Sequence, residues 1–191
     1  MPRHVDHDQR RADIIEAAKQ ILANGGPDGM TIRSVAKRLG GSITLVTHYY
    51  PTRPELMRAV VAEMNESYDT ELADLEAGAD AHGRLYILLE WMLPLTELEW
   101  VNESSRIQLL GRRGQDPSVE EFADAMDARM RDLLRQHLEP LVPKDRVEGY
   151  VDLLRVTTNG IVLSAVEHHD DWPAKRQLRV LEAALTAFGL K

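Results

Sequence analysis

The sequence predicts an all-α protein, and three observations support that prediction. Nearly every apolar stretch of the 191 residues repeats with helical period, and none alternates with the two-residue period of a strand. Aromatic residues are only 5% of the chain, so Leu, Ala, Val and Met supply most of the core, a mixture that favours helices over strands. Glycine and proline separate the periodic stretches, as they do where helices end.

Three helices are expected near the N-terminus, the first over about residues 11–24. The glycine-rich run at 25–29 ends it. The second follows Thr31, whose hydroxyl is a good N-cap, and ends at Gly40, which can adopt the left-handed conformation of a helix end. The third, over about 42–49, is very short and stops before a proline.

Six longer helices are expected in the rest of the chain, the first beginning at Pro54. They span about 54–77, 81–93, 97–113, 118–139, 145–169 and 174–188. We place a domain boundary at the start of the first of these. The prediction is an N-terminal domain of residues 1–54 and a larger helical domain of residues 55–191.

Charge is distributed unevenly along a chain whose net charge is −8. Residues 1–58 hold nine Lys or Arg and six Asp or Glu, whereas the remainder holds 14 basic and 25 acidic residues. The absence of cysteine excludes a disulfide framework, a thiolate zinc site and a cysteine nucleophile. No apolar run approaches the roughly 18 residues of a membrane span, and residues 1–11 lack a secretory apolar stretch. We therefore expect a cytoplasmic protein.

Residues 31–50 have the pattern of a helix-turn-helix: two short helices, a tight glycine turn and the small Ala36 at the crossing. At 100° per residue, the second helix turns Val46 and Tyr49 inward, and small hydrogen-bonding side chains occupy the opposite arc. Such a surface suits a helix that enters a major groove about 12 Å wide. The same pattern also fits a plain αα-corner. Gly41 stands where such turns usually carry a buried apolar residue, which predicts a looser turn or thinner packing.

The run from Leu45 to Leu56, with the preceding helices, resembles the N-terminal domain of the TetR (tetracycline-repressor-like) family. Thr47 and His48 stand where members carry two tyrosines, and Tyr49 stands at the place of a histidine. The resemblance implies phosphate contacts at helix N-termini and basic side chains, and base or backbone contacts along the second short helix. The DNA-binding residues it implies are Thr31, Arg33, Ser42, Ile43, Thr44, Thr47, His48, Tyr49 and Arg53. Tyr49 is equally compatible with a place in the core.

The resemblance also implies a homodimer that binds a palindromic DNA operator, represses transcription and is released by a small-molecule effector. Two heads about 34–36 Å apart would read half-sites one helical turn apart. The helix at 145–169 is apolar on more than one face and must bury both. With helix 174–188 it predicts a dimer interface, whose candidate residues are Leu154, Ile161, Leu163, Leu178, Leu181 and Leu185.

An effector pocket is expected among the helices from 81 to 139, where apolar and aromatic residues accompany a few polar ones. Its candidates are Tyr86, Glu90, Trp91, Trp100, Met126 and Met130. A core filled by Met and Trp explains the same residues. A carboxylate beside a tryptophan would suit a cationic ligand. The stretch from Leu154 to Pro173 loosely resembles the betaine-regulator-like branch of the family.

No enzyme signature occurs: the chain lacks a Gly-rich phosphate loop, Gly-x-Ser-x-Gly, His-Glu-x-x-His and Glu-x-x-His. The run His168 to Asp171 has metal-like composition, but histidine at a helix end also complements the helix dipole. We predict a regulator that is not an enzyme and has no cofactor and no metal site. The alternative is a helical protein that binds a small molecule or a partner without binding an operator.

Overall fold

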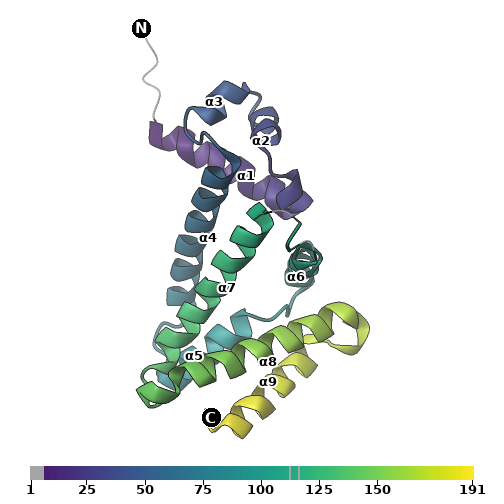
Figure 1. The fold of residues 1–191 in the computed structure, drawn as a ribbon. Coiled ribbons are helices and arrows are strands. Elements are labelled where there is room, and N and C mark those ends of the chain that lie inside the picture. The colour runs from purple at the N-terminus through teal and green to yellow at the C-terminus, as the bar shows by residue number, and fades with distance from the viewer. Residues whose placement is uncertain (1–6, 112, 116) are drawn as a thin grey trace. The chain divides into compact units, whose positions relative to one another are not determined.

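The computed structural model describes residues 7–111, 113–115 and 117–191, apart from the side chains of residues 23–25, 27, 28 and 118. In these ranges nine α-helices and two short 3-10 helices occur and no strand, which confirms the all-α prediction (Figure 1). The α-helices are α1 (His7–Gly29), α2 (Ile32–Arg38), α3 (Ile43–Thr47), α4 (Arg53–Leu75), α5 (Ala81–Trp91), α6 (Glu97–Leu110), α7 (Pro117–Leu138), α8 (Val147–Glu167) and α9 (Ala174–Phe188). None of these helices is long and apolar enough to cross a membrane.

The first helix differs from expectation at both ends. It begins at His7, four residues early, and Gln9 Nε2 donates a hydrogen bond to Asp13 Oδ1 at 2.9 Å across the added turn. The expected break occurs at Gly26, where φ is 65° and ψ is −178°, but helical structure then continues to Gly29. Only glycine adopts such a positive φ at little cost, because it has no Cβ.

The chain divides into two compact units. One comprises the described residues up to Ser67 together with those of Leu109–Asp124, and the other comprises Tyr68–Gln108 and Ala125–Lys191. The helices α4 and α7 therefore contribute residues to both. The domain division at residues 54 and 55 stays a prediction.

The first unit has its own hydrophobic core, built by the first four helices. Side chains from α1 and α4 close over the inward faces of α2 and α3. The small Ala36 is only 2% exposed, which agrees with a close approach of helices at this point. The buried members of this core are Ile14, Ala17, Ala18, Met30, Val35, Ala36, Val46, Tyr50, Leu56, Met57 and Val60.

The second unit has a larger core to which α5, α7, α8 and α9 contribute, and α8 and α9 pack side by side (Figure 1). Its fully buried side chains include Leu88, Leu134, Leu154 and Leu181. Apolar residues at helical spacing on all these helices explain why periodicity alone predicted them.

The polar residues Glu76 and His137 are buried at this core, and the exposed Arg84 lies beside them. His137 Nε2 is 2.6 Å from Glu76 Oε1, and His137 Nδ1 is 2.7 Å from the carbonyl oxygen of Leu133. Arg84 Nε donates to the other oxygen of Glu76 at 2.9 Å. Both nitrogens of His137 thus face oxygen atoms. The Glu76 and His137 residues are each 8% exposed, so this pair is shielded from water.

A network of ion pairs joins α7 to α8. Asp127 accepts hydrogen bonds from Arg155 at 2.8 and 3.1 Å and from Arg131 at 2.9 Å, and Arg131 also reaches Asp152 at 2.7 Å. Burial raises the pKa of Asp127, but the hydrogen bonds and charges of Arg155 and Arg131 outweigh it and hold that pKa below its ordinary value. Arg155 is 8% exposed and depends on this carboxylate for its neutralisation.

We expect Asp127→Asn to lower the free energy of unfolding by about 1 kcal/mol at pH 7, a modest value because the Asp127 side chain is 43% exposed and water screens its charge. Since the folded pKa is lowered, the carboxylate stabilises the fold above its ordinary pKa, and this contribution is lost as pH falls through the folded pKa. Urea unfolding at pH 7 and at about pH 3 measures the difference, which should shrink in acid. The exposed Glu120→Gln is the control. If Asp127→Asn lowered the free energy of unfolding equally at both pH values, the prediction would be contradicted.

Candidate nucleic-acid interface

The helix α2 begins at a reciprocal cap. Thr31 Oγ1 accepts from the Ser34 backbone N–H at 3.0 Å, and Ser34 Oγ accepts from the Thr31 backbone N–H at 2.9 Å. Met30 before the cap and Val35 in the next turn are both fully buried, as a hydrophobic staple requires. The predicted N-cap at Thr31 is confirmed, and its side chain is exposed at the surface.

The turn after α2 is closed by two backbone hydrogen bonds. Gly40 N donates to Lys37 O at 3.1 Å and Gly41 N donates to Ala36 O at 3.0 Å, the pattern of a Schellman motif, with a φ of 64° at Gly40. A Cβ at Gly41 would lie 3.4 Å from Leu45 Cδ1, so Leu45 fills the space beside this glycine. The turn is therefore not loose, contrary to the expectation drawn from a glycine at position 41.

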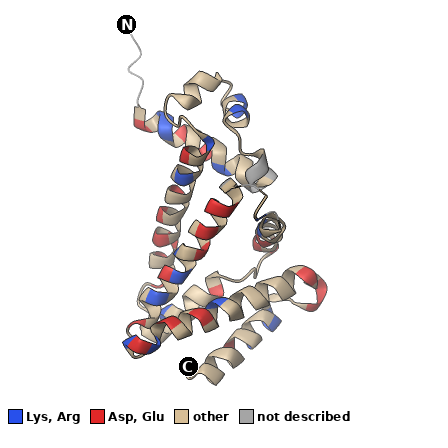
Figure 2. Cartoon of the chain, in the orientation of Figure 1, with Lys and Arg blue, Asp and Glu red and all other residues tan. Residues whose placement is uncertain are grey.

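The helix α3 presents an uncharged outer face. Ser42 caps it, with its Oγ accepting from Leu45 N at 3.2 Å. Val46 is fully buried and holds α3 on the core, whereas Ile43 is 45% exposed. Thr44 is also exposed, and Thr47 is half-buried. Figure 2 shows Lys and Arg on the neighbouring α1 and α2 and none on α3. The structure thus brings four of the predicted residues, Ser42, Ile43, Thr44 and Thr47, together on one short helix and its cap.

Tyr49 is half-buried at the edge of the first unit's core. Its ring packs against the core of the first unit, and its hydroxyl lies 2.9 Å from His7 Nδ1 at the start of α1. His48 is exposed and meets the Tyr49 ring edge-on, with centroids 5.0 Å apart. Sequence reasoning missed His7, since no local pattern links residues 42 positions apart.

The two predicted arginines differ in their surroundings. Arg33 is exposed on α2. Arg53 is half-buried, and its Nε donates to the carbonyl oxygen of Met30 at 2.9 Å. Arg53 therefore ties the start of α4 to the segment before α2, a role that the sequence did not indicate.

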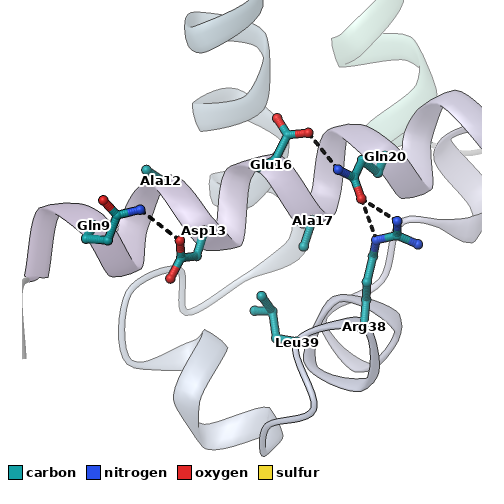
Figure 3. Close-up of a pocket in the computed structure, with 8 residues that line it drawn as sticks. All are labelled: Gln9, Ala12, Asp13, Glu16, Ala17, Gln20, Arg38 and Leu39. Atoms are coloured by element: carbon teal, nitrogen blue, oxygen red, sulfur yellow. Dashed lines mark hydrogen bonds between the residues drawn. The ribbon is translucent and has the colours of Figure 1, made fainter.

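A groove of about 410 Å³ opens between α1 and α2 (Figure 3). The polar side chains that line it form hydrogen bonds with one another. Gln20 Nε2 donates to Glu16 Oε1 at 2.8 Å, and Arg38 Nε donates to Gln20 Oε1 at 2.9 Å. Ala17 and Leu39 supply apolar lining. These residues are not among those predicted for an effector.

The residues predicted for an effector pocket fall in several places. Trp91 meets Tyr68 of α4 edge-on, with ring centroids 5.0 Å apart. Trp100 lies on His169, with centroids 4.5 Å apart, and its Nε1 donates to Ala165 O at 3.0 Å. That bond anchors α6 to α8.

The other four are spread over the second unit. Tyr86 lines a cavity of about 260 Å³ with residues of α5 and α9. Met130 packs against the core, and Glu90 and Met126 are half-buried. Among the described residues, no three His, Asp or Glu side chains gather as a metal site, and His169 instead lies 3.3 Å from Glu97 Oε2.

The candidate dimer residues need a correction. Leu154, Ile161, Leu181 and Leu185 are at most 4% exposed within the single chain, because they form the contact between α8, α9 and the other helices. They offer no surface to a second copy. Leu178 is half-buried against the same core, and Leu163 is 43% exposed.

The first unit thus carries a capped helix, a closed glycine turn and a short second helix with an exposed hydrogen-bonding face. This arrangement, in a chain that also has a larger helical unit, defines a DNA-binding transcriptional regulator of the helix-turn-helix class. The family model described as bacterial regulatory proteins, tetR family, matches residues 14–60. The model described as BetI-type transcriptional repressor, C-terminal, matches residues 81–189, more than half of the chain. The chain belongs to the TetR family.

Similar proteins agree with this placement. The HTH-type transcriptional regulator PksA of Bacillus subtilis (strain 168) is 33% identical over 100 residues, which are 51% of this chain and only 48% of PksA. The HTH-type transcriptional repressor Rv1474c of Mycobacterium tuberculosis is 23% identical over 76% of this chain and 78% of its own length. A transcriptional regulator from Saccharomonospora viridis, solved in complex with choline, has a TM-score of 0.69 at 20% identity, with 94% of this chain and 97% of that chain covered.

Proposed function

We propose that this protein is a cytoplasmic repressor that binds a palindromic operator as a homodimer and leaves it when a small-molecule effector binds. The observation that carries the proposal is the outer face of α3, where Ser42, Ile43 and Thr44 are exposed and uncharged. Hydroxyl groups and a methyl-bearing side chain can meet base edges in a major groove. In the dimer, the two DNA-binding domains could adopt more than one spacing. An effector that binds more tightly to a spacing unsuited to the operator would lower operator affinity, and the size of this effect is set by the difference in its affinity for the two spacings.

The test is fluorescence anisotropy on the DNA that flanks the protein's own gene, titrated against salt and compared with a scrambled duplex. Tight, salt-dependent binding that prefers the native sequence is the expected result. Equal, weak binding to the native duplex, the scrambled duplex and genomic fragments would favour the alternative of a sensor without an operator.

Replacing Thr44 or Thr47 by Ala should relax sequence preference. Each change removes a hydroxyl from the outer arc of α3, so the ratio of native to scrambled affinity should fall about fivefold or more. The measurement is the same anisotropy titration on both duplexes, and Ser105→Ala on the exposed side of α6 is the control. An unchanged ratio in both threonine variants would remove these residues from the readout.

The surface proposed for dimerisation is a stripe along α8. Leu153, Val156 and Leu163 are 46%, 74% and 43% exposed, and they recur at the spacing of one helix face. Gly149 and Gly160 lie at the same spacing, with open space around the position of a Cβ. Exposed apolar residues in a row indicate an interface rather than scattered surface leucines.

A second copy is the partner we propose for this stripe. The adjacent α9 exposes small residues, Ala183 and Ala187, which let another helix approach closely. Two copies of α8 and α9 can then form a four-helix contact with two-fold symmetry, in which the same patch serves both chains. A palindromic operator has the matching symmetry.

We propose that the effector is an organic cation held near Tyr68 and Trp91. Burial, then the carboxylates of Glu103 and Glu71, raise the pKa of Tyr68, so its ring lies in apolar surroundings near two acidic side chains. Glu103 Oε2 is fixed by Arg106 Nε at 2.6 Å. Two aromatic rings beside a carboxylate attract a quaternary ammonium group. The choline complex of the Saccharomonospora viridis regulator makes choline the first compound to test.

Calorimetric titration with choline tests this site. Its uncharged carbon isostere, 3,3-dimethylbutan-1-ol, has the same shape and should bind at least about tenfold more weakly if the charge is recognised. Trp91→Leu and Glu103→Gln should each weaken choline binding. The change Trp100→Phe should not, because the Trp100 ring lies against His169 and its Nε1 donates to Ala165 O, away from Tyr68 and Trp91. Equal binding of both compounds would contradict a cationic effector.

A further inference from the structure

Four side chains gather beside the end of α3. His7 Nδ1 lies 2.9 Å from the Tyr49 hydroxyl, and the two ring centroids are 5.8 Å apart. His48 meets Tyr49 edge-on at 5.0 Å and lies 6.5 Å from His7. The guanidinium of Arg11 stands 5.8 Å from the centre of the Tyr49 ring. The first turns of α1 therefore contact Tyr49, which is both a predicted DNA-binding residue and part of the packing against the core.

The hydrogen bond between His7 and Tyr49 has two possible directions. A phenol hydroxyl has one proton to donate and lone pairs that accept. If His7 Nδ1 accepts, the only proton of Tyr49 is used inside the protein, and lone pairs face outward. If His7 Nδ1 carries a proton and donates, the Tyr49 proton is available to a group outside. A phosphate oxygen accepts only, so it can pair with Tyr49 only in the second arrangement.

We propose that His7 is a positioning residue for the DNA backbone: it donates to the Tyr49 oxygen and thereby turns the Tyr49 proton toward a phosphate. This inference rests on the proposed function. His48 restricts rotation of the Tyr49 ring through its edge-on contact. Arg11, on the same helix as His7, adds a positive charge beside the ring, where a phosphate would approach.

Three substitutions separate positioning from a general loss of fold. His7→Asn keeps an amide nitrogen close to the place of Nδ1, His7→Leu removes every donor, and Tyr49→Phe removes the hydroxyl. The probe is a fluorescein-labelled 30-base-pair duplex of random sequence at low salt, because a phosphate contact does not depend on sequence. The exposed His168→Leu at the end of α8 is the matched control.

We expect His7→Leu and Tyr49→Phe each to weaken duplex binding about fivefold, as the loss of one hydrogen bond does. The double variant should bind no more weakly than Tyr49→Phe alone, because both changes remove the same contact. His7→Asn should recover most of the affinity, and thermal melting should be unchanged for all of them.

Two results would overturn the role of His7 while leaving the proposed function intact. One is full affinity in His7→Leu, and the other is a double variant whose loss is the product of the two single losses. A wild-type protein that binds neither this duplex nor its own flanking DNA would instead overturn the proposed function, and the role of His7 with it.

Discussion

Replacing Val156 by Glu is expected to separate the proposed dimer and to weaken operator binding about 100-fold or more. Val156 is 74% exposed in the single chain, so the change costs the fold little. In the dimer the new carboxylate would face its own copy across the two-fold axis, and both charges would lose water without gaining a partner. Operator affinity falls because two linked heads bind far more tightly than one.

Sedimentation velocity measures the oligomeric state, and fluorescence anisotropy on full-operator and half-site duplexes measures the loss of DNA affinity. The half-site affinity should change little, since each head keeps its own α3. Leu98→Glu is the control, because Leu98 is 71% exposed on α6 and lies outside the stripe. A Val156→Glu protein that remains dimeric would show that the chains associate through another surface.

Replacing Glu76 by Ala should lower the free energy of unfolding by about 1–3 kcal/mol, because it leaves a ring nitrogen of the buried His137 without its hydrogen-bond partner. The carboxylate serves both His137 Nε2 and Arg84 Nε, at 2.6 and 2.9 Å. With His137 8% exposed, water cannot replace the lost contact. In thermal unfolding the change corresponds to a Tm lower by about 5 °C.

Two further variants separate the contributions. Arg84→Ala should cost no more than about 1 kcal/mol, since the side chain is 53% exposed and its pair is screened. Glu76→Gln keeps the volume but only one acceptor, so it should fall between the other two. The exposed Glu63→Ala on α4 is the surface control. A Glu76→Ala protein as stable as Arg84→Ala would mean that the buried pair contributes nothing net.

Local features were predictable from the sequence because they depend on residues a few positions apart. The cap at Thr31, the left-handed Gly40 and the two faces of α3 each follow from side chains within one or two helical turns. The start of the first helix was predicted four residues too late. The hydrogen bond from Gln9 to Asp13 that supports its first turn leaves only a weak pattern in the sequence. Helical periodicity gave the remaining elements.

Partners far apart in the chain could not be predicted. Periodicity showed that α8 is apolar on two faces, but it could not say which face the protein's own core takes. The structure turns Leu154 and Ile161 inward and leaves Val156 outside. Likewise, a tryptophan at position 91 is compatible with core or pocket until Tyr68 is placed beside it.

The sequence by itself determined the helical fold, the helix-turn-helix and the face of α3, since each depends on local backbone preferences and on which side of one helix is apolar. Only the tertiary structure decided the pairing of His7 with Tyr49, of Glu76 with His137 and of Arg53 with the Met30 carbonyl. Those contacts join segments 23 to 61 residues apart. They form only when burial of the apolar faces brings the helices together, and that packing is a property of the whole unit.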